Sequence, residues 1–377
     1  MNKKKIKVLF LIHDLGKGGA EKVLVNLVNN MDHSKFDITV MTLFDGGVNR
    51  QFLSEHVRYL YWCKRTIPGN SKLMKLLSPE RLHKMIVKER YDIEVSYLEG
   101  PSARVVSGCP DTGTKLVSWV HIEIHTEKRA AGSFRSISEA RKCYERFDRL
   151  AFVSNTVREC FEKTLKIQKQ GEVLYNTNES SKIRELSIEN TDEIAFPEDK
   201  FKMVGVGKLL KSKGFDRVLR VLKRLKDEGC PVMLYLLGDG REKDELMNFV
   251  KENELEEQVV FLGYRVNPYK YVRRCDLFVC ASHAEGFSTA ATEALIVGTP
   301  VCTVEVSGMK EMLGENNEYG IVTENSEEGL YRGIKSLLDD PELLAHYTRK
   351  AEERGRSFST ETTVKAVEDM LLSLIEK

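Results

Sequence analysis

The sequence contains no C-x-x-C pair, and its eight cysteines are scattered over 377 residues. Several of them lie inside apolar runs, as Cys280 does in LFVCAS. Structural zinc sites and disulfide frameworks instead bring cysteines together at short, regular spacings. The cysteine pattern therefore indicates reduced, buried thiols in a cytosolic protein.

Long apolar runs are also missing, since no segment reaches the roughly 18 apolar residues of a membrane-spanning helix. The first residues, MNKKKIKVLFLIHDLG, resemble the start of a signal peptide. Their apolar part is only about one strand long, however, and no small-residue cleavage site follows it. We therefore expect a cytoplasmic protein that is soluble or lies at the inner face of the cell membrane.

The net charge is small, at +1, which gives no general attraction for nucleic acid. Within residues 1–90, however, seventeen Lys or Arg face only eight Asp or Glu, so the rest of the chain is net acidic. A basic half of this kind is either a solvated face or a surface for a partner.

Residues 70–91 mix basic side chains with an apolar stripe, as in helices that lie on anionic membranes. An ordinary amphipathic helix that covers a sheet has the same pattern. Both interpretations hold if residues 70–78 touch lipid while the later residues pack on the core. The apolar and basic residues are Leu73, Met74, Leu76, Leu77, Leu82, Met85, Ile86, Val87, Lys72, Lys75, Arg81, Lys84, Lys88 and Arg90.

Short apolar runs alternate with amphipathic helices along the whole chain, which is typical of βαβ units and parallel sheets. One series starts at IKVLFLI (6–12) and a second at FKMVGVG (201–207). We predict two doubly wound α/β domains, which would bind ligand in a cleft at the carboxyl ends of their strands. The predicted parts are an N-terminal domain (1–180), a linker (181–200), a C-terminal domain (201–357) and a helix (358–377) that packs back on the N-terminal domain.

The strongest motif is EGFSTAATEAL, in which Glu285 follows a predicted strand and Glu293 lies eight residues later in a predicted helix. Gly286 allows the backbone to approach a ligand, and Ser288 or Thr289 can begin the helix. The free N–H groups at such a helix start attract a diphosphate, and Glu293 could accept hydrogen bonds from ribose hydroxyls. An acidic loop followed by a solvated helix face explains the two glutamates equally well.

A second motif, GVGKLLKSKGF (205–215), again runs from a strand through a glycine turn into a helix. Lys208 and Lys213 could neutralise the two phosphates of a leaving nucleotide, where negative charge develops. The segment does not match G-x-x-x-x-G-K-[ST], so it is no NTPase loop. A lysine-rich surface is the alternative.

Two further segments follow strands of the first series. In GKGGAEKVLVNL, Gly18 and Gly19 could let phosphate or acceptor pass close to the backbone, or could simply make a tight turn. In SWVHIEIH, His121 ends a predicted strand and could hydrogen-bond a sugar or acceptor. Because His121, Glu123 and His125 alternate, a zinc site is an alternative, although no other ligand cluster accompanies them.

Together, the segments GGAEKVLVNL, VSWVH, VGVGKLLKSKGFDRVLRVL, LLGDG, VVFLGY and EGFSTAATEALIVGTPV resemble the retaining glycosyltransferases of the GT-B fold in their large family four, the glycosyl transferases group 1. The resemblance extends from residue 6 to the last helix. It implies an acceptor-binding N-terminal domain and a nucleotide-sugar-binding C-terminal domain. The implied reaction moves a sugar from a nucleotide-diphosphate sugar, with a UDP-sugar favoured, to a glycan or polyprenyl-linked acceptor. Capsular, exopolysaccharide or other cell-surface glycan synthesis is the implied setting.

The resemblance also implies roles for single residues. Lys213 would bind the donor phosphates, Glu293 the ribose, and Glu285 the donor sugar, while His121 would lie near the transferred sugar. His121, Glu285 and Lys213 are accordingly the catalytic candidates. The donor-binding candidates are Gly18, Gly19, Lys208, Lys213, Tyr264, Arg265, Glu285, Gly286, Phe287, Ser288, Thr289 and Glu293, with Tyr264 and Arg265 flanking the base.

Two positions depart from the family pattern. The family usually has Gly-Arg-Leu where this chain has Gly207-Lys208-Leu209, so a bidentate phosphate clamp becomes a point charge. It usually has Asn-Gly-Val-Asp where this chain has Asn176-Thr177-Asn178-Glu179. The second departure leaves the role of Asn176 open.

We expect neither a metal nor a cofactor, because the two lysines can supply the counter-charge and no D-x-D at a strand end requires a metal. The resemblance implies front-face substitution, with a donor phosphate oxygen accepting the acceptor's proton. A GT-B nucleotide-sugar epimerase, a phosphorylase and a non-catalytic sugar-binding protein are the alternatives. A phosphorylase normally has a pyridoxal-phosphate lysine, for which the sequence offers no candidate.

Overall fold

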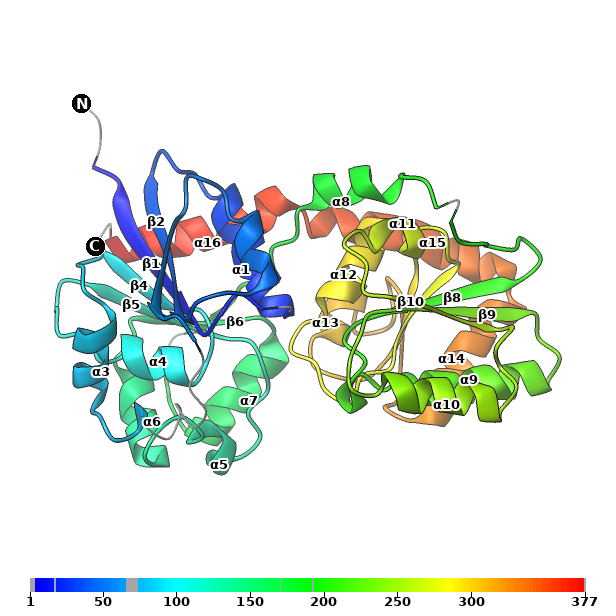
Figure 1. Cartoon of the computed structure of the whole chain (residues 1–377), viewed down its shortest axis with the longest axis horizontal. Helices are drawn as coiled ribbons and strands as arrows, with labels where there is room; N and C mark the ends of the chain where they lie inside the picture. Colours follow the sequence, from blue (N-terminus) through cyan, green and yellow to red (C-terminus); the bar gives the residue numbers. More distant parts are fainter. Residues whose placement is uncertain (1–3, 17, 66–73, 170, 192, 376–377) are drawn as a thin grey trace. The chain divides into compact units, whose positions relative to one another are not determined.

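The computed structural model describes residues 4–16, 18–65, 74–169, 171–191 and 193–375. These residues form two compact α/β units (Figure 1). Unit 1 comprises residues 1–177 and 360–377, and unit 2 comprises residues 178–359. The prediction of two doubly wound domains is confirmed, since each unit contains one parallel sheet with helices on both faces.

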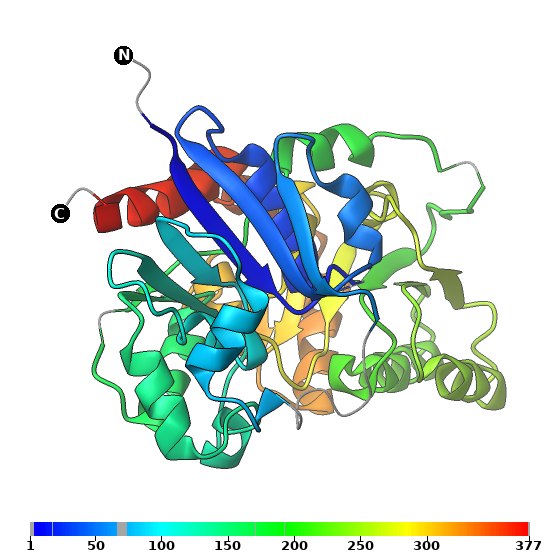
Figure 2. The ribbon, with the colours of Figure 1, turned by 60° about the vertical axis from the view of Figure 1, so that its left-hand side comes forward.

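Unit 1 has a seven-stranded parallel sheet in the order β3-β2-β1-β4-β5-β6-β7. Its interior strand β1 is fully buried from Val8 to Ile12, as expected for a parallel sheet covered on both faces. Helix α16 contacts α1 beside this sheet (Figure 2). The elements of unit 1 are β1 (Ile6–Ile12), α1 (Gly19–Asn30), β2 (Phe36–Phe44), η1 (Val48–Phe52), β3 (Arg58–Cys63), α3 (Pro79–Ile86), β4 (Ile93–Ser96), α4 (Pro101–Val106), β5 (Lys115–Val120), α5 (Glu127–Ala130), α6 (Ile137–Glu145), β6 (Arg149–Phe152), α7 (Asn155–Leu165), β7 (Gly171–Val173) and α16 (Thr360–Ile375).

Unit 2 has a six-stranded parallel sheet in the order β10-β9-β8-β11-β12-β13. Helices α9, α10 and α14 cover one face, and α11, α12 and α15 cover the other (Figure 1). The short edge strand β13 is absent from our sequence-based expectations. The elements of unit 2 are α8 (Ser180–Ser187), β8 (Phe201–Val206), η2 (Lys211–Lys213), α9 (Phe215–Asp227), β9 (Val232–Leu237), α10 (Lys243–Glu252), β10 (Val259–Gly263), α11 (Tyr269–Val272), β11 (Leu277–Cys280), α12 (Thr289–Ile296), β12 (Val301–Val304), α13 (Met309–Leu313), β13 (Ile321–Thr323), α14 (Glu327–Asp339) and α15 (Pro341–Ser357).

The strand order reverses at the first strand of each sheet. In unit 1, β1 lies between β2 and β4, and in unit 2, β8 lies between β9 and β11. Doubly wound sheets bind ligands at this switch point, beyond the carboxyl ends of the strands. The segments that follow β1, β4, β8 and β11 therefore hold the residues of interest.

The segment 181–200, which the sequence predicts as a linker, falls within unit 2 and contacts its core. The hydroxyl of Tyr235 donates to the carbonyl of Ala195 at 2.7 Å, and the Tyr235 ring stacks on Phe196. The hydroxyl of Tyr271 donates to the Glu193 carboxylate at 2.5 Å. A carbonyl, a carboxylate and an aromatic ring thus connect the segment to unit 2.

The amphipathic segment 70–91 is described from residue 74 onward. Its second half forms α3, which buries Leu82 and Ile86 and packs against α4. The apolar stripe of this half therefore faces the protein core. Across the described part of the chain, no helix combines the length and apolarity needed to cross a bilayer.

Candidate active site

The loop after β8 places Lys213 at the carboxyl edge of the unit 2 sheet. Gly214 adopts the left-handed conformation (φ 66°) that ends η2 and begins α9. A Cβ atom at Gly214 would lie 2.0 Å from the carbonyl oxygen of Ala281, which follows β11. Glycine is therefore required here both by conformation and by close packing. This packing fixes Lys213 next to the end of β11.

Lys213 forms an ion pair with Glu285. Its Nζ lies 2.6 Å from Oε1 of Glu285, and the hydroxyl of Ser282 donates to the same oxygen at 2.6 Å. The Lys213 side chain keeps 31% of its surface exposed, and that of Glu285 keeps 11%. The two residues are 72 positions apart, so the structure brings together two groups predicted from separate motifs.

Helix α12 begins at Thr289, four residues after Glu285. The Ser288 hydroxyl caps it by accepting a hydrogen bond from the Ala291 amide at 3.4 Å. Phe287 is buried and packs edge-on against Phe358. These contacts hold the turn from Gly286 to Thr289, and the first amides of α12 lie at the carboxyl edge of β11. A helix start of this kind carries partial positive charge.

Glu293 lies inside α12 and is only 7% exposed. The hydroxyl of Tyr269 donates to its Oε1 at 3.3 Å, which orients the buried carboxylate. Sequence reasoning missed Tyr269. A possible signal was its place two residues after Asn267, at the start of the helical turn α11 that follows β10.

Three other donor-site candidates are more exposed. Lys208 is exposed at the start of the loop after β8. Tyr264, with 54% of its surface exposed, and Arg265 follow β10 at the same edge of the sheet. The Nε of Arg265 donates to the Leu262 carbonyl at 3.0 Å. The backbone around these two residues is thereby held close to the strand end.

In unit 1, Gly18 and Gly19 lie at the start of α1. Gly18 precedes the helix with φ −93°, which any residue can adopt. A Cβ atom there would meet the flexible carboxylate of Glu21 at 1.8 Å, so a larger residue requires only that side chain to move. Gly19 is the exposed first residue of α1. The Glu21 carboxylate therefore lies over the helix start, and neither glycine is required by an unusual backbone conformation.

His121 directly follows β5 and is only 8% exposed. Its ring lies 4.8 Å from the Tyr97 ring and 6.0 Å from the Trp119 ring, measured between centroids. Burial lowers the pKa of His121 to about 3, so the imidazole is neutral at physiological pH. Its Nε2 is buried and has no hydrogen-bond partner among the described residues. A buried polar atom without a partner at a strand end indicates a ligand position.

Glu99, which sequence reasoning also missed, follows β4 and supports the His121 position. Its Oε2 accepts a hydrogen bond from the backbone N–H of His121 at 3.0 Å. Burial raises the pKa of the Glu99 carboxyl. The available signal was its position directly after the predicted strand IEVSYL, at the switch point of the sheet.

His121, Glu123 and His125 do not converge on a zinc site. Glu123 Oε2 lies 2.9 Å from Nε2 of His125, whereas the His121 ring packs against Tyr97 and Trp119. Within the described ranges, three potential metal ligands gather only at His83, Glu94 and Cys109, and that group is buried.

The buried group is organised as an ion pair between α3 and β4. The Nε2 of His83 lies 2.8 Å from Glu94 Oε2, and the Cys109 thiol lies 3.7 Å from Glu94 Oε1. Burial alone would lower the pKa of His83, but the hydrogen bonds to Cys109 and Glu94 more than offset it and raise the pKa to about 9. The three groups satisfy one another.

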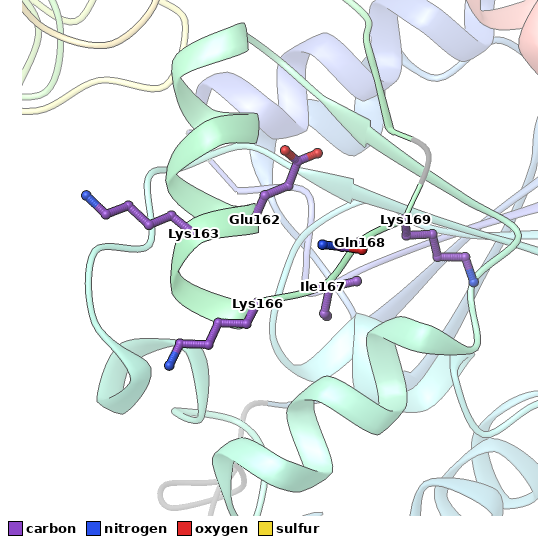
Figure 3. A pocket seen from close by; sticks show the side chains of 6 residues that line it. All are labelled: Glu162, Lys163, Lys166, Ile167, Gln168 and Lys169. Carbon is purple, nitrogen blue, oxygen red and sulfur yellow. The ribbon is translucent and has the colours of Figure 1, made fainter.

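A hollow of about 530 Å³ lies at the other end of unit 1, where α7 leads into β7. Because α7 ends at the amino edge of the sheet, this hollow is remote from His121. Figure 3 shows that its three lysines point away from one another and form no converging cationic site. The lining residues are Glu162, Lys163, Lys166, Ile167, Gln168 and Lys169.

The two doubly wound units, together with the Lys213–Glu285 pair and the α12 start in unit 2, define the class of the protein. It has the GT-B architecture, with charged groups suited to a nucleotide diphosphate. Comparisons with known proteins then identify the family. Residues 17–177 match the model of Glycosyltransferase Family 4, and residues 187–354 match that of Glycosyl transferases group 1.

A Campylobacter jejuni relative, N-acetylgalactosamine-N,N'-diacetylbacillosaminyl-diphospho-undecaprenol 4-alpha-N-acetylgalactosaminyltransferase, is 30% identical over 376 residues, covering 98% of this chain and 99% of its own. The lipopolysaccharide core biosynthesis glycosyltransferase LpsD of Rhizobium meliloti is 28% identical over 49% of this chain and 52% of its own. The chain therefore belongs to the family-four glycosyltransferases of the GT-B fold.

Solved structures share the fold at low identity. The Anabaena protein Alr3699/HepE in complex with UDP matches with a TM-score of 0.75 and 20% identity, covering 98% of this chain and 100% of that one. The same Anabaena protein has been solved with UDP-glucose. These matches confirm the GT-B architecture predicted from the sequence.

Proposed function

We propose that the protein is a retaining, metal-independent hexosyltransferase that moves a sugar from a UDP-sugar to a lipid-linked glycan acceptor. The observation that carries the donor assignment is the arrangement of Lys213, Glu285 and Glu293 at the carboxyl edge of unit 2. A nucleotide diphosphate needs a cation for its phosphates and an acceptor for its ribose hydroxyls, and these side chains supply both.

Lys213 carries the main electrostatic role in this proposal. Its ammonium group is paired with Glu285 at 2.6 Å. A bound diphosphate competes for the same ammonium group, which stabilises the charge that develops as the glycosyl–phosphate bond breaks. Glu285 then has an oxygen available for a sugar hydroxyl. Lys208 and the backbone amides from Phe287 to Thr289, which lead into α12, add to the positive field.

Glu293 and His121 have different roles in this proposal. Glu293, oriented by Tyr269, accepts hydrogen bonds from the ribose. His121 contributes a neutral imidazole, whose Nε2 hydrogen-bonds the sugar without adding charge. We also propose that a phosphate oxygen of the donor takes the proton of the attacking hydroxyl on the same face, so that the configuration of the anomeric carbon is retained.

The experiment that tests this function has two stages. A panel of nucleotide sugars is screened by thermal unfolding, since a donor at ~100 times its dissociation constant adds ~2.7 kcal/mol of stability. The stabilising donor is then incubated with a polyprenyl-diphosphate-linked sugar in excess EDTA, and the product linkage is determined by NMR. An α-product from an α-donor, formed at the same rate with and without EDTA, is expected. An inverted linkage, or activity restored only by magnesium or manganese, would reject the mechanism.

The acceptor proposal is supported by the Campylobacter relative, which is named for a diphospho-undecaprenol substrate. It implies that unit 1 works at the cytoplasmic face of a membrane. Leu76 is 75% exposed, yet its backbone is held by Arg135, which donates to the carbonyls of Lys75 at 2.6 Å and Leu76 at 2.7 Å. A fixed, exposed leucine beside basic groups suits an anionic interface.

Vesicle sedimentation tests the membrane contact. The wild type should pellet with anionic vesicles at low salt and be released at high salt, because each Lys or Arg near the surface adds ~1 kcal/mol. Lys72→Glu/Lys75→Glu should remain in the supernatant, although Lys72 itself lies outside the described residues. Lys223→Glu/Lys226→Glu in unit 2 is the charge-matched control and should still pellet. A wild type that never pellets would favour a soluble acceptor.

A further inference from the structure

The end of the SWVHIEIH motif has no role in the proposed transfer, yet it meets a cysteine from another element. His125 lies in the segment after β5, and Cys160 lies in α7. The Cys160 Sγ and the His125 Nδ1 are 3.4 Å apart, within hydrogen-bonding distance for sulfur. The other ring nitrogen of His125 lies 2.9 Å from Glu123 Oε2. The three side chains form a thiol–imidazole–carboxylate series.

The carboxylate determines which nitrogen of His125 carries the proton. Glu123 can only accept from the imidazole, so Nε2 is the protonated nitrogen. Nδ1 then presents its lone pair to the Cys160 thiol, which is the arrangement of a general base beside a nucleophile. The His125 side chain is 65% exposed, whereas that of Glu123 is only 16% exposed. The carboxylate is therefore held in place while the imidazole remains open to solvent.

The thiol itself needs this base. Burial raises the pKa of Cys160, so the sulfur keeps its proton at neutral pH. Cys63 and Cys230 are also half-buried, but neither has a histidine nitrogen at hydrogen-bonding distance in the described part of the chain. Most of the other cysteines, such as Cys302, are buried in the core. Accessibility and a neighbouring base coincide only at Cys160 among these thiols.

We propose that Cys160 is a site of covalent modification by soft electrophiles, with His125 as the base and Glu123 as the residue that positions it. The thiol proton moves from Sγ to Nδ1 of His125, and the sulfur attacks the electrophilic carbon. With an alkyl iodide, a C–S bond forms as the C–I bond breaks and iodide leaves. The imidazolium then releases its proton to water.

Competitive alkylation of the full chain tests the proposal. The protein is exposed to limiting iodoacetamide at pH 7, then unfolded, and the remaining thiols are labelled with heavy iodoacetamide for peptide mass spectrometry. Cys160 should react about tenfold faster than Cys63 and Cys230, an advantage smaller than the roughly 10²–10⁴-fold typical of general base catalysis in an active site. His125→Gln should remove most of this advantage, and the matched variant His56→Gln should keep it.

Variants of Glu123 separate positioning from folding. Glu123→Ala should slow the labelling of Cys160, and Glu123→Gln should restore much of it, because the Gln carbonyl still accepts from Nε2–H. Labelling of buried Cys302 reports any unfolding in each sample. Equal rates at Cys160, Cys63 and Cys230, or a Cys160 rate unchanged by His125→Gln with Cys302 still protected, would overturn the proposal.

Discussion

The candidate residues of the two units differ in whether they carry a charge. In unit 2, Lys213 and Glu285 form an ion pair at a partly exposed strand edge. In unit 1, His121 is buried and neutral, and it packs on the rings of Tyr97 and Trp119. Lys213 and Glu285 follow β8 and β11 at the switch point of their sheet, and His121 follows β5, which is next to β4. Both sets lie at the carboxyl ends of parallel strands, and their chemistry differs.

The difference teaches which part of a substrate each unit is suited to bind. A diphosphate carries charge that must be neutralised, and a cation near solvent can exchange one anionic partner for another at low cost. A sugar hydroxyl is neutral and gains most from a desolvated polar group with a free lone pair or proton. On this basis, unit 2 is suited to the nucleotide diphosphate and unit 1 to hydroxyl groups.

The largest expected effect comes from removing the charged groups of unit 2. Lys213→Ala and Glu293→Ala should each weaken UDP-sugar binding by about one to two orders of magnitude, because each removes a hydrogen bond to a charged group worth ~1.5–3 kcal/mol. Titration calorimetry measures the change. Lys211→Ala, which alters an exposed lysine two residues away, is the control and should bind donor like the wild type. If both variants bound the UDP-sugar as tightly as the wild type, the proposal that these residues of unit 2 bind the donor would be wrong.

The His83–Glu94 pair tests whether unit 1 can also bury a charged side chain when a partner of opposite charge lies beside it. The pKa of His83 is raised to about 9, whereas an unfolded histidine titrates near 6.5. The stabilisation by the pair should therefore be complete below pH 6.5 and be lost as the pH rises through about 9. His83→Gln should lower the free energy of unfolding by about 1.5–3 kcal/mol at pH 6.

Denaturant unfolding at several pH values measures this effect. The difference between the wild type and His83→Gln should shrink from pH 6.5 toward pH 9, while His56→Gln, at an exposed histidine of the same unit, should show no such trend. A difference that stays constant with pH would mean that His83 is buried as a neutral ring.

Much of the fold was predictable because buried parallel strands are continuous apolar runs. The predicted run IKVLFLI matches β1 residue for residue. The edge strand β13 has only three residues and is half-buried, so it lacks such a run. In the segment 181–200, the hydrogen bonds to Tyr235 and Tyr271 use carbonyl and carboxylate oxygens, and the hydrophobicity of the sequence does not predict such contacts.

Candidate residues could be predicted where a charged side chain stands next to a glycine in a motif. Lys213 and Glu285 were identified from separate motifs, and their 2.6 Å contact needed the fold. Tyr269 and Glu99 were missed because each acts on a residue 22 or 24 positions away, through a hydroxyl or a carboxylate outside any motif. Side chains that orient a site residue from another element leave no local pattern in the sequence.

The smallest expected effect concerns His121, the neutral side of the comparison. His121→Phe keeps the ring contacts with Tyr97 and Trp119, and its backbone N–H can still donate to Glu99. It loses only the ring nitrogens. Turnover should therefore fall about 2–10-fold, the range for a neutral hydrogen bond worth ~0.5–1.5 kcal/mol. Steady-state rates at saturating donor measure this loss.

The pH dependence of that loss decides whether His121 acts as a neutral group. Because burial lowers its pKa to about 3, the imidazole gains no proton in the native state above about pH 5, although the unfolded chain titrates near 6.5. The turnover ratio of wild type to His121→Phe should thus stay constant from pH 5 to 8. The wild type should lose stability as the pH falls from 6.5 toward 3, since the unfolded state then binds the extra proton, and His121→Phe should lose less. A turnover ratio that changes sharply near pH 6.5 would show a titrating imidazole, and unit 1 would then use charge as unit 2 does.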